Sequence, residues 1–170
     1  MRNVEIKAGI KNVNALISKV RSLSDNDGKI IKQHDTFFKV PQGRFKLRKF
    51  EEGNAELIYY ERPDTEGPKV SSYEKANISG EAVNDLSSIL EKALGMQNVV
   101  KKVRHLFLVG QTRIHVDSVE GLGDFMELEV VLNDDQTLKD GENIALDLMK
   151  KLDVNKEDLI SGAYADLLNK

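Results

Sequence analysis

The sequence predicts an α+β fold in which eight antiparallel strands close into a β-barrel with helices flanking it. Two observations support this prediction. Short segments alternate charged and apolar residues and are separated by turn residues, which is typical of strands joined by hairpins. Four other segments carry apolar residues at helical spacing. With 170 residues, the chain is predicted to form one domain over residues 1–170, large enough to bury about 70% of its unfolded surface.

The alternation of charged and apolar residues is clearest between Gly43 and Arg48. There Arg44, Lys46 and Arg48 point to one side of the expected strand, and Phe45 and Leu47 point to the other. The same pattern recurs along the chain, with turn signals such as Asp25–Gly28 and Glu52–Asn54 between the segments. The expected strands cover residues 2–10, 29–40, 43–51, 55–62, 69–77, 99–108, 111–118 and 124–132.

Four helices are expected, each with one apolar face. Asn12 is placed to cap a helix that runs to Leu23, and Gly95 ends a second helix over about 80–94. Two amphipathic helices, over about 140–151 and 155–168, complete the chain. We see no internal repeat and no low-complexity linker.

Composition excludes several classes of function. The net charge of −3 argues against a nucleic-acid partner. The absence of cysteine excludes disulfides and thiolate metal sites and fits a reducing compartment. The N-terminus lacks the apolar core of a signal peptide, and no run approaches the ~20 apolar residues of a membrane span. We therefore expect a cytoplasmic protein with no membrane partner.

The charged strand faces suggest the site. Such faces usually turn to water, but inside a closed barrel they would form a cationic tunnel with acidic patches, suited to a polyphosphate and its divalent metal. Glu5, Glu127 and Glu129 are the candidate ligands of Mg²⁺ or Mn²⁺, because these ions prefer carboxylate oxygens; solvent-facing charge is the alternative. The candidate triphosphate-binding bases are Lys7, Arg44, Lys46, Arg48, Arg62, Lys75, Lys102, Arg104 and Arg113.

The three histidines have no paired spacing and favour structural roles, although His115 shares a face with Arg113 and Asp117 and is a candidate proton carrier.

Taken together, these motifs resemble a known family. Asn3-Val4-Glu5-Ile6-Lys7 is similar to the Glu-x-Glu-x-Lys signature of CYTH domains, the triphosphate tunnel metalloenzymes. The resemblance continues through Gly43–Arg48, Tyr60–Pro63, Ser72–Lys75, Lys102–Arg104, Gln111–Asp117, Gly121–Gly123 and Phe125–Glu129. The order and spacing of these motifs over some 125 residues carry the likeness, which is strongest to class IV adenylyl cyclases.

The resemblance implies an eight-stranded tunnel in which Glu5, Glu127 and Glu129 hold the metal and the bases grip the triphosphate. It places Arg113 and Asp117 toward the reacting end, so that Lys7, Arg113 and Asp117 are the candidate catalytic residues. It also implies a homodimer. The family signature has glutamate where this chain has Asn3, which weakens a second metal position.

Three functions remain open at this point. Phosphohydrolysis of a nucleoside triphosphate or inorganic tripolyphosphate is narrowly preferred, because binding the phosphates between the bases requires no nucleobase pocket. The first alternative is an adenylyl cyclase that converts ATP to 3′,5′-cyclic AMP and pyrophosphate. The second is a protein that binds polyphosphate or nucleotide without turnover, which Asn3 makes plausible. The absence of tryptophan argues against a thiamine triphosphatase.

Overall fold

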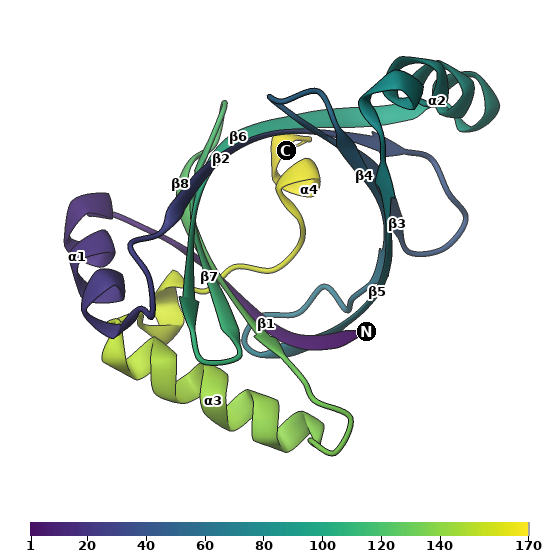
Figure 1. Cartoon of the computed structure of the whole chain (residues 1–170). Coiled ribbons are helices and arrows are strands. Elements are labelled where there is room, and N and C mark those ends of the chain that lie inside the picture. Colours follow the sequence, from purple (N-terminus) through teal and green to yellow (C-terminus); the bar gives the residue numbers. More distant parts are fainter. Residues whose placement is uncertain (170) are drawn as a thin grey trace.

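The computed structural model describes residues 1–169, and its strands form a closed antiparallel barrel in the order β1-β5-β4-β3-β2-β6-β7-β8. Figure 1 looks down this ring of strands. The eight-stranded barrel with flanking helices, predicted from the alternating segments, is thus confirmed. The strands are β1 (Arg2–Gly9), β2 (Lys29–Phe38), β3 (Arg44–Phe50), β4 (Ala55–Glu61), β5 (Lys69–Ile78), β6 (Met96–Val109), β7 (Thr112–Val119) and β8 (Gly123–Val131).

The longer helices lie against the outer wall of the barrel. Helices α1 (Val13–Leu23) and α3 (Leu138–Lys151) lie on one side of the ring, and α2 (Gly80–Leu94) lies on another (Figure 1). Asn12 caps α1 by accepting a hydrogen bond from the Ala15 amide, as its position predicts. Helix α3 begins with a capping box formed by Thr137 and Asp140.

The apolar core lies between the outer wall of the barrel and these helices. Leu47 is fully buried beneath α2, where it packs with Val83. On the opposite side, strand residues such as Ile6 and Leu128 pack against α1 and α3. Because successive side chains of a strand point to opposite faces, the alternate, charged residues of the same strands face the inside of the barrel. The hydrophobic effect on the outside therefore turns the charged faces inward.

The end of the chain differs from the predicted helix over 155–168. Only a 3₁₀ turn, η1 (Lys156–Asp158), and a short helix, α4 (Tyr164–Leu168), form there. Between them Gly162 has a φ of +84°, a left-handed conformation that glycine adopts readily. The Ile160 amide donates a hydrogen bond to the Lys7 carbonyl, which fastens this segment to β1. The chain then enters the ring of strands, where α4 lies (Figure 1).

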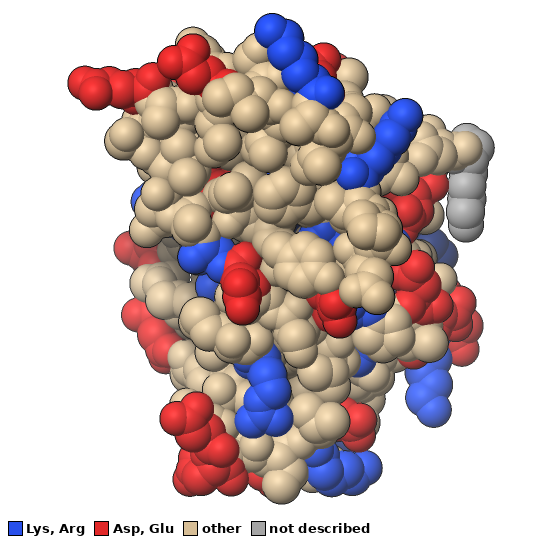
Figure 2. All heavy atoms as spheres, turned by 90° about the vertical axis from the view of Figure 1, so that its right-hand side faces the viewer, with Lys and Arg blue, Asp and Glu red and all other residues tan. Residues whose placement is uncertain are grey.

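The outer surface shows no segregation of charge on the side formed by β3, β4 and β5. Acidic and basic side chains are interspersed on this face (Figure 2). Among the described residues, no helix has the length and apolar character needed to cross a membrane.

Candidate functional site

The barrel encloses a cavity of about 300 Å³, and 13 of the 27 residues that line it are charged. Its wall holds eight lysine and arginine residues and five carboxylates, an excess of three positive charges. The basic residues are Lys7, Lys46, Arg48, Arg62, Lys75, Lys102, Arg104 and Arg113. The acidic residues are Glu5, Asp35, Glu56, Glu127 and Glu129. The sequence-predicted bases, except Arg44, are therefore brought together around one cavity.

A buried carboxylate on β2 organises three of these bases. Asp35 accepts two hydrogen bonds of 2.8 Å from Arg48 and one each from Lys46 and Lys102, at 3.1 and 3.0 Å. Burial alone would raise the pKa of Asp35, but the surrounding cations hold it well below its usual value. Burial lowers the pKa of Lys46 to about 8 and that of Lys102 to about 7, since the charged amines are far from water.

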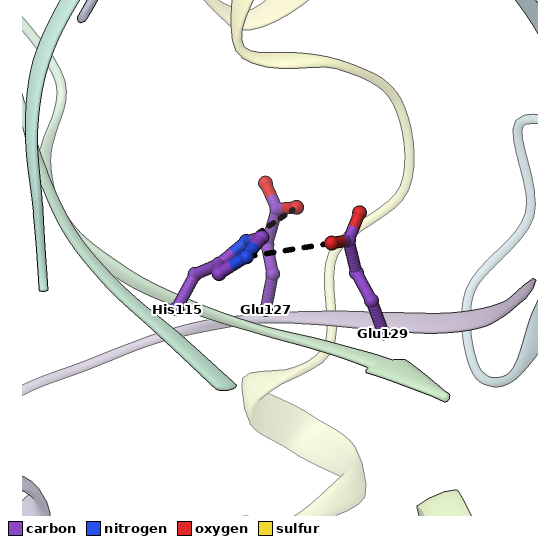
Figure 3. Close-up of side chains that lie close together, drawn as sticks. All are labelled: His115, Glu127 and Glu129. Carbon is purple, nitrogen blue, oxygen red and sulfur yellow. Dashed lines mark ion pairs between the residues drawn. The ribbon is translucent and has the colours of Figure 1, made fainter. Parts of the chain in front are cut away.

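Figure 3 shows His115, Glu127 and Glu129, which point toward one another from the neighbouring strands β7 and β8. One ligand atom from each lies within 4.8 Å of the others. Burial opposes ionisation of Glu127, but Lys7, His115 and Arg104 hold its pKa well below the usual value. Carboxylates and an imidazole suit a divalent metal, and Nδ1 of His115 is buried without a hydrogen-bond partner among residues 1–169. The residues present therefore fit a metal ion.

The third predicted metal ligand, Glu5, lies beside this cluster and makes an ion pair. Its Oε2 is 2.7 Å from Nη1 of Arg62. Burial and the negative charge of Glu129 raise the pKa of Glu5 to about 7, which Arg62 opposes only in part. Glu5 can therefore exchange between a neutral and an ionised form near neutral pH, and an arriving cation would favour the ionised form.

Asp117, a predicted catalytic residue, is buried and engaged by two partners. Arg104 donates two hydrogen bonds of 2.8 Å to its carboxylate, and the Tyr164 hydroxyl donates another of 2.8 Å. Burial would raise the pKa of Asp117, but Arg104 lowers it below the usual value. In this arrangement the carboxylate is an ionised acceptor that orients Arg104, which itself lines the cavity.

The C-terminal segment contributes Ala163 and Tyr164 to the tunnel lining. The Gly162 carbonyl accepts hydrogen bonds from Lys7, at 3.1 Å, and from Arg62, at 3.3 Å. The ring of Tyr164 lies 4.0 Å from the Lys7 ammonium, an attractive cation–π contact. Two bases on the wall are thus held by backbone and aromatic groups of the segment that follows η1.

Uncharged side chains are interspersed with the bases on the tunnel wall. Ile31 and Gln33 on β2, Phe50 on β3 and Leu106 on β6 are among them. In the strand registers Ile31 is opposite Arg104, and Gln33 lies between Lys102 and Phe50. The buried Oε1 of Gln33 has no hydrogen-bond partner among residues 1–169. Buried polar atoms are normally paired, so this oxygen is available to a donor group of a ligand.

The remaining predicted site residues have different positions. Arg44 lies outside the cavity lining, where it contacts Asp166 of α4 at 2.6 Å and Asp64 at 3.1 Å. Lys75 lines the tunnel and contacts Glu56 at 2.9 Å. Arg113 lines it as well, with its Nε 3.3 Å from Glu129. These last two side chains are 39% and 31% exposed, so solvent reaches the wall at each of these positions.

Three further residues contribute to the tunnel but were not among the sequence-predicted site residues. Asp35 lies two residues from both Gln33 and Phe37 on β2 and therefore shares their face of the strand. The two-residue alternation could thus have placed it inside the barrel. His115 was considered only as a proton carrier, yet it shares the inward face of Arg113. Tyr164 could not be found, because the sequence predicted a continuous helix around it.

Comparisons with known proteins agree with this geometry. The profile of the CYTH domain matches residues 1–164. A protein of Methanocaldococcus jannaschii named "Putative adenylate cyclase" is 28% identical and aligns over 98% of both chains. The adenylate cyclase CyaB of Aeromonas hydrophila is 25% identical over 96% of this chain and 87% of its own. A solved structure from Pyrococcus horikoshii has a TM-score of 0.81, with 23% identity, and covers 97% of this chain and 98% of its own.

Proposed function

Because the chain belongs to the CYTH domain family, we propose that it is a metal-dependent enzyme that converts a nucleoside triphosphate to a 3′,5′-cyclic nucleotide and pyrophosphate. The charge of the tunnel carries this proposal. Eight bases face five carboxylates inside a cavity of about 300 Å³. A desolvated excess of positive charge is costly unless an anion enters, and a triphosphate supplies several negative charges at once.

Two observations support a nucleoside triphosphate over inorganic tripolyphosphate. Ile31, Phe50 and Leu106 place apolar groups among the bases of the tunnel wall, and a chain of phosphates alone would leave these groups and the amide oxygen of Gln33 without a partner. In addition, two relatives that align over nearly the whole chain carry the name adenylate cyclase.

The tunnel residues have distinct roles in such a reaction. The ribose 3′-hydroxyl forms a new bond to the α-phosphorus, while the bond from that phosphorus to the oxygen bridging to the β-phosphate breaks. Arg48, Lys46 and Lys102 would bind the phosphates and offset the charge that develops on the departing pyrophosphate. Arg104, oriented by Asp117, would contact the reacting phosphate. The hydroxyl proton passes to solvent.

His115, Glu127 and Glu129 would hold the divalent metal, with Glu5 beside them. When bound, the metal polarises the phosphoryl oxygens and lowers the barrier to attack. The C-terminal segment contacts two bases of the wall, because the Gly162 carbonyl accepts hydrogen bonds from Lys7 and Arg62 and the Tyr164 ring lies against Lys7.

Phosphohydrolysis is the second candidate. It would use the same phosphate-binding residues, with water as the nucleophile. It is favoured by the exposure of Lys75 and Arg113, 39% and 31% of whose side-chain surfaces remain accessible. Water can therefore reach a terminal phosphate bound near them. The sequence alone favoured this reaction narrowly, whereas the apolar groups among the bases and the names of the two relatives favour cyclisation.

The decisive experiment resolves the products formed from ATP and from tripolyphosphate with Mg²⁺ or Mn²⁺. Cyclic AMP with pyrophosphate is the expected outcome. Orthophosphate with ADP or with pyrophosphate would indicate hydrolysis, and tight binding without product would indicate a binding protein.

Two neighbouring lysines provide a matched control for this assay. Lys102 is buried in the tunnel, whereas Lys101 is exposed on the outer wall. Lys102→Ala should weaken triphosphate binding by about 1.5–3 kcal/mol, the contribution of a charge-assisted hydrogen bond. Lys101→Ala should leave binding nearly unchanged, and equal effects of the two substitutions would contradict a site in the tunnel.

A further inference from the structure

His115 is buried between two carboxylates, and both of its contacts with them are longer than a typical hydrogen bond. Its Nε2 lies 3.4 Å from Oε1 of Glu129, and its Nδ1 lies 3.9 Å from Oε2 of Glu127. Both distances exceed the 2.7–3.2 Å typical of nitrogen–oxygen hydrogen bonds. Nδ1 has no hydrogen-bond partner among residues 1–169, although only 5% of the side chain is exposed. A buried nitrogen left unpaired in this way requires an explanation.

The three side chains have the spacing that a shared ion requires. One ligand atom from each lies within 4.8 Å of the others. Donors about 2.0–2.2 Å from a metal lie up to roughly 4.4 Å from one another, so small side-chain rotations would bring all three into contact with one ion. All three side chains project into the tunnel from adjacent strands (Figure 3).

The surroundings favour a neutral third ligand at this place. Lys7 is 3.5 Å from Glu127, and Arg113 is 3.3 Å from Glu129, so the two carboxylates already have positive neighbours. Glu5 is paired with Arg62. The first signature position holds Asn3, which brings no charge. An imidazole nitrogen binds a metal without adding a further buried charge.

We propose that His115 is a ligand of the divalent metal and that the site prefers a first-row transition ion, such as Mn²⁺ or Co²⁺, to Mg²⁺. The inference rests on the metal dependence in the proposed function. Magnesium is a hard ion that prefers oxygen ligands, whereas imidazole favours transition metals. One nitrogen and two carboxylates therefore change which ion the tunnel retains, relative to a site made of carboxylates alone.

The first test is spectroscopic and needs no turnover. Pulsed electron paramagnetic resonance of the full chain with Mn²⁺ alone should show hyperfine coupling to one directly bound ¹⁴N nucleus. His115→Gln should abolish this coupling. Bound Mn²⁺ without nitrogen coupling in the unaltered protein would overturn the proposal, as would a failure to bind Mn²⁺ in the absence of phosphate.

The second test measures selectivity by calorimetric titration of Mn²⁺, Co²⁺ and Mg²⁺. His115→Gln should lower the affinity for Mn²⁺ and Co²⁺ by about tenfold or more, since even indirect perturbation of metal ligands has effects of that size. The affinity for Mg²⁺ should change much less. Equal losses for all three ions, or no loss, would overturn the proposal.

His34→Gln is the matched control. His34 lies opposite Lys49 and Lys101 in the strand registers and outside the cavity lining, so its substitution should leave all three affinities unchanged. Thermal unfolding without metal shows whether each variant is folded. A product assay with Mg²⁺, run in parallel, separates the two proposals. Turnover without nitrogen coupling would contradict the role of His115 as a ligand but would agree with the proposed function.

Discussion

At the scale of single residues, Asp35 shows how the tunnel tolerates its concentration of bases. It is 1% exposed and contacts Arg48, Lys46 and Lys102. Removing one partner from a buried set of ions leaves the others uncompensated. An internal carboxylate therefore keeps three phosphate-binding candidates in place when no phosphate is present.

Replacing this carboxylate should be costly. We expect Asp35→Asn to lower the free energy of unfolding by about 3–5 kcal/mol, measured by urea denaturation at neutral pH. Glu51→Gln is the control, because Glu51 pairs with Lys32 on the surface at 3.3 Å, and such exposed pairs contribute about 0–1 kcal/mol. A loss below 1 kcal/mol for Asp35→Asn would show that the bases do not depend on this counter-charge.

The same lysines predict how phosphate binding depends on pH. In the free protein the pKa of Lys102 is about 7 and that of Lys46 about 8. A bound polyphosphate raises both pKa values, so the complex holds more protons than the free protein. Binding then takes up protons, and affinity falls as pH rises above 7.

Calorimetry without metal from pH 7.5 to 9.5, where the terminal phosphate stays ionised, should show this fall, at most about tenfold per pH unit for each proton taken up. Titrations in buffers of different ionisation enthalpy measure the protons directly. Affinity that stays constant across this range would exclude protonation of the lysines on binding.

At the scale of elements, the strands were predictable because each carries its own two-residue period. Lys46 and Arg48 alternate with Phe45 and Leu47, and that alternation alone assigns the tunnel face. The interruption of the last helix was not predictable in this way. Leu159, Ala163 and Leu167 keep helical spacing, but the break falls at Gly162, whose φ is +84°, and contacts made after folding, such as that between Ile160 and the Lys7 carbonyl, fix the new path of the chain.

The site was predictable to a similar degree. The two-residue alternation along each strand indicates which bases face the tunnel. Arg44 has the same place in this alternation as Lys46, yet it pairs with Asp166 and Asp64. Its position depends on where α4 and the loop before β5 lie, which local sequence does not specify. Tyr164 reaches Asp117 for the same reason.

The C-terminal segment depends on one glycine. Gly162 has a φ of +84°, and a Cβ there would lie 3.3 Å from Asp166. Gly162→Ala should therefore cost roughly 1–2 kcal/mol of backbone strain and loosen the contacts of Lys7 and Arg62 with this carbonyl. Chemical denaturation and amide hydrogen exchange of residues 160–168 measure both effects.

Gly9→Ala is the control for this prediction. A Cβ at Gly9 meets no atom within 4 Å, and no left-handed conformation is required there. Equal costs for the two substitutions would indicate that the conformation of Gly162 is not what holds the segment in place.

At the scale of the whole molecule, the barrel inverts the usual distribution of charge. Apolar side chains lie on the outer wall beneath α1, α2 and α3, and charged ones lie inside. A ligand that neutralises the interior stabilises the folded state only, because the unfolded chain does not gather these bases. The stability of the barrel should therefore report on occupation of the tunnel.

Tripolyphosphate or a non-hydrolysable ATP analogue should therefore produce a large rise in melting temperature. At a ligand concentration of about 100 times Kd, the folded state gains about 2.7 kcal/mol. For a domain of 170 residues, each kcal/mol corresponds to roughly 2–4 °C, so a shift of about 5–11 °C is expected.

Sulfate at equal ionic strength should produce a much smaller shift, because it cannot span several bases at once. Arg62→Ala should reduce the shift while Arg2→Ala, at an exposed position, should not. A shift of the same size with sulfate, or one indifferent to Arg62, would mean that the anion acts on the outer surface and that the tunnel remains empty.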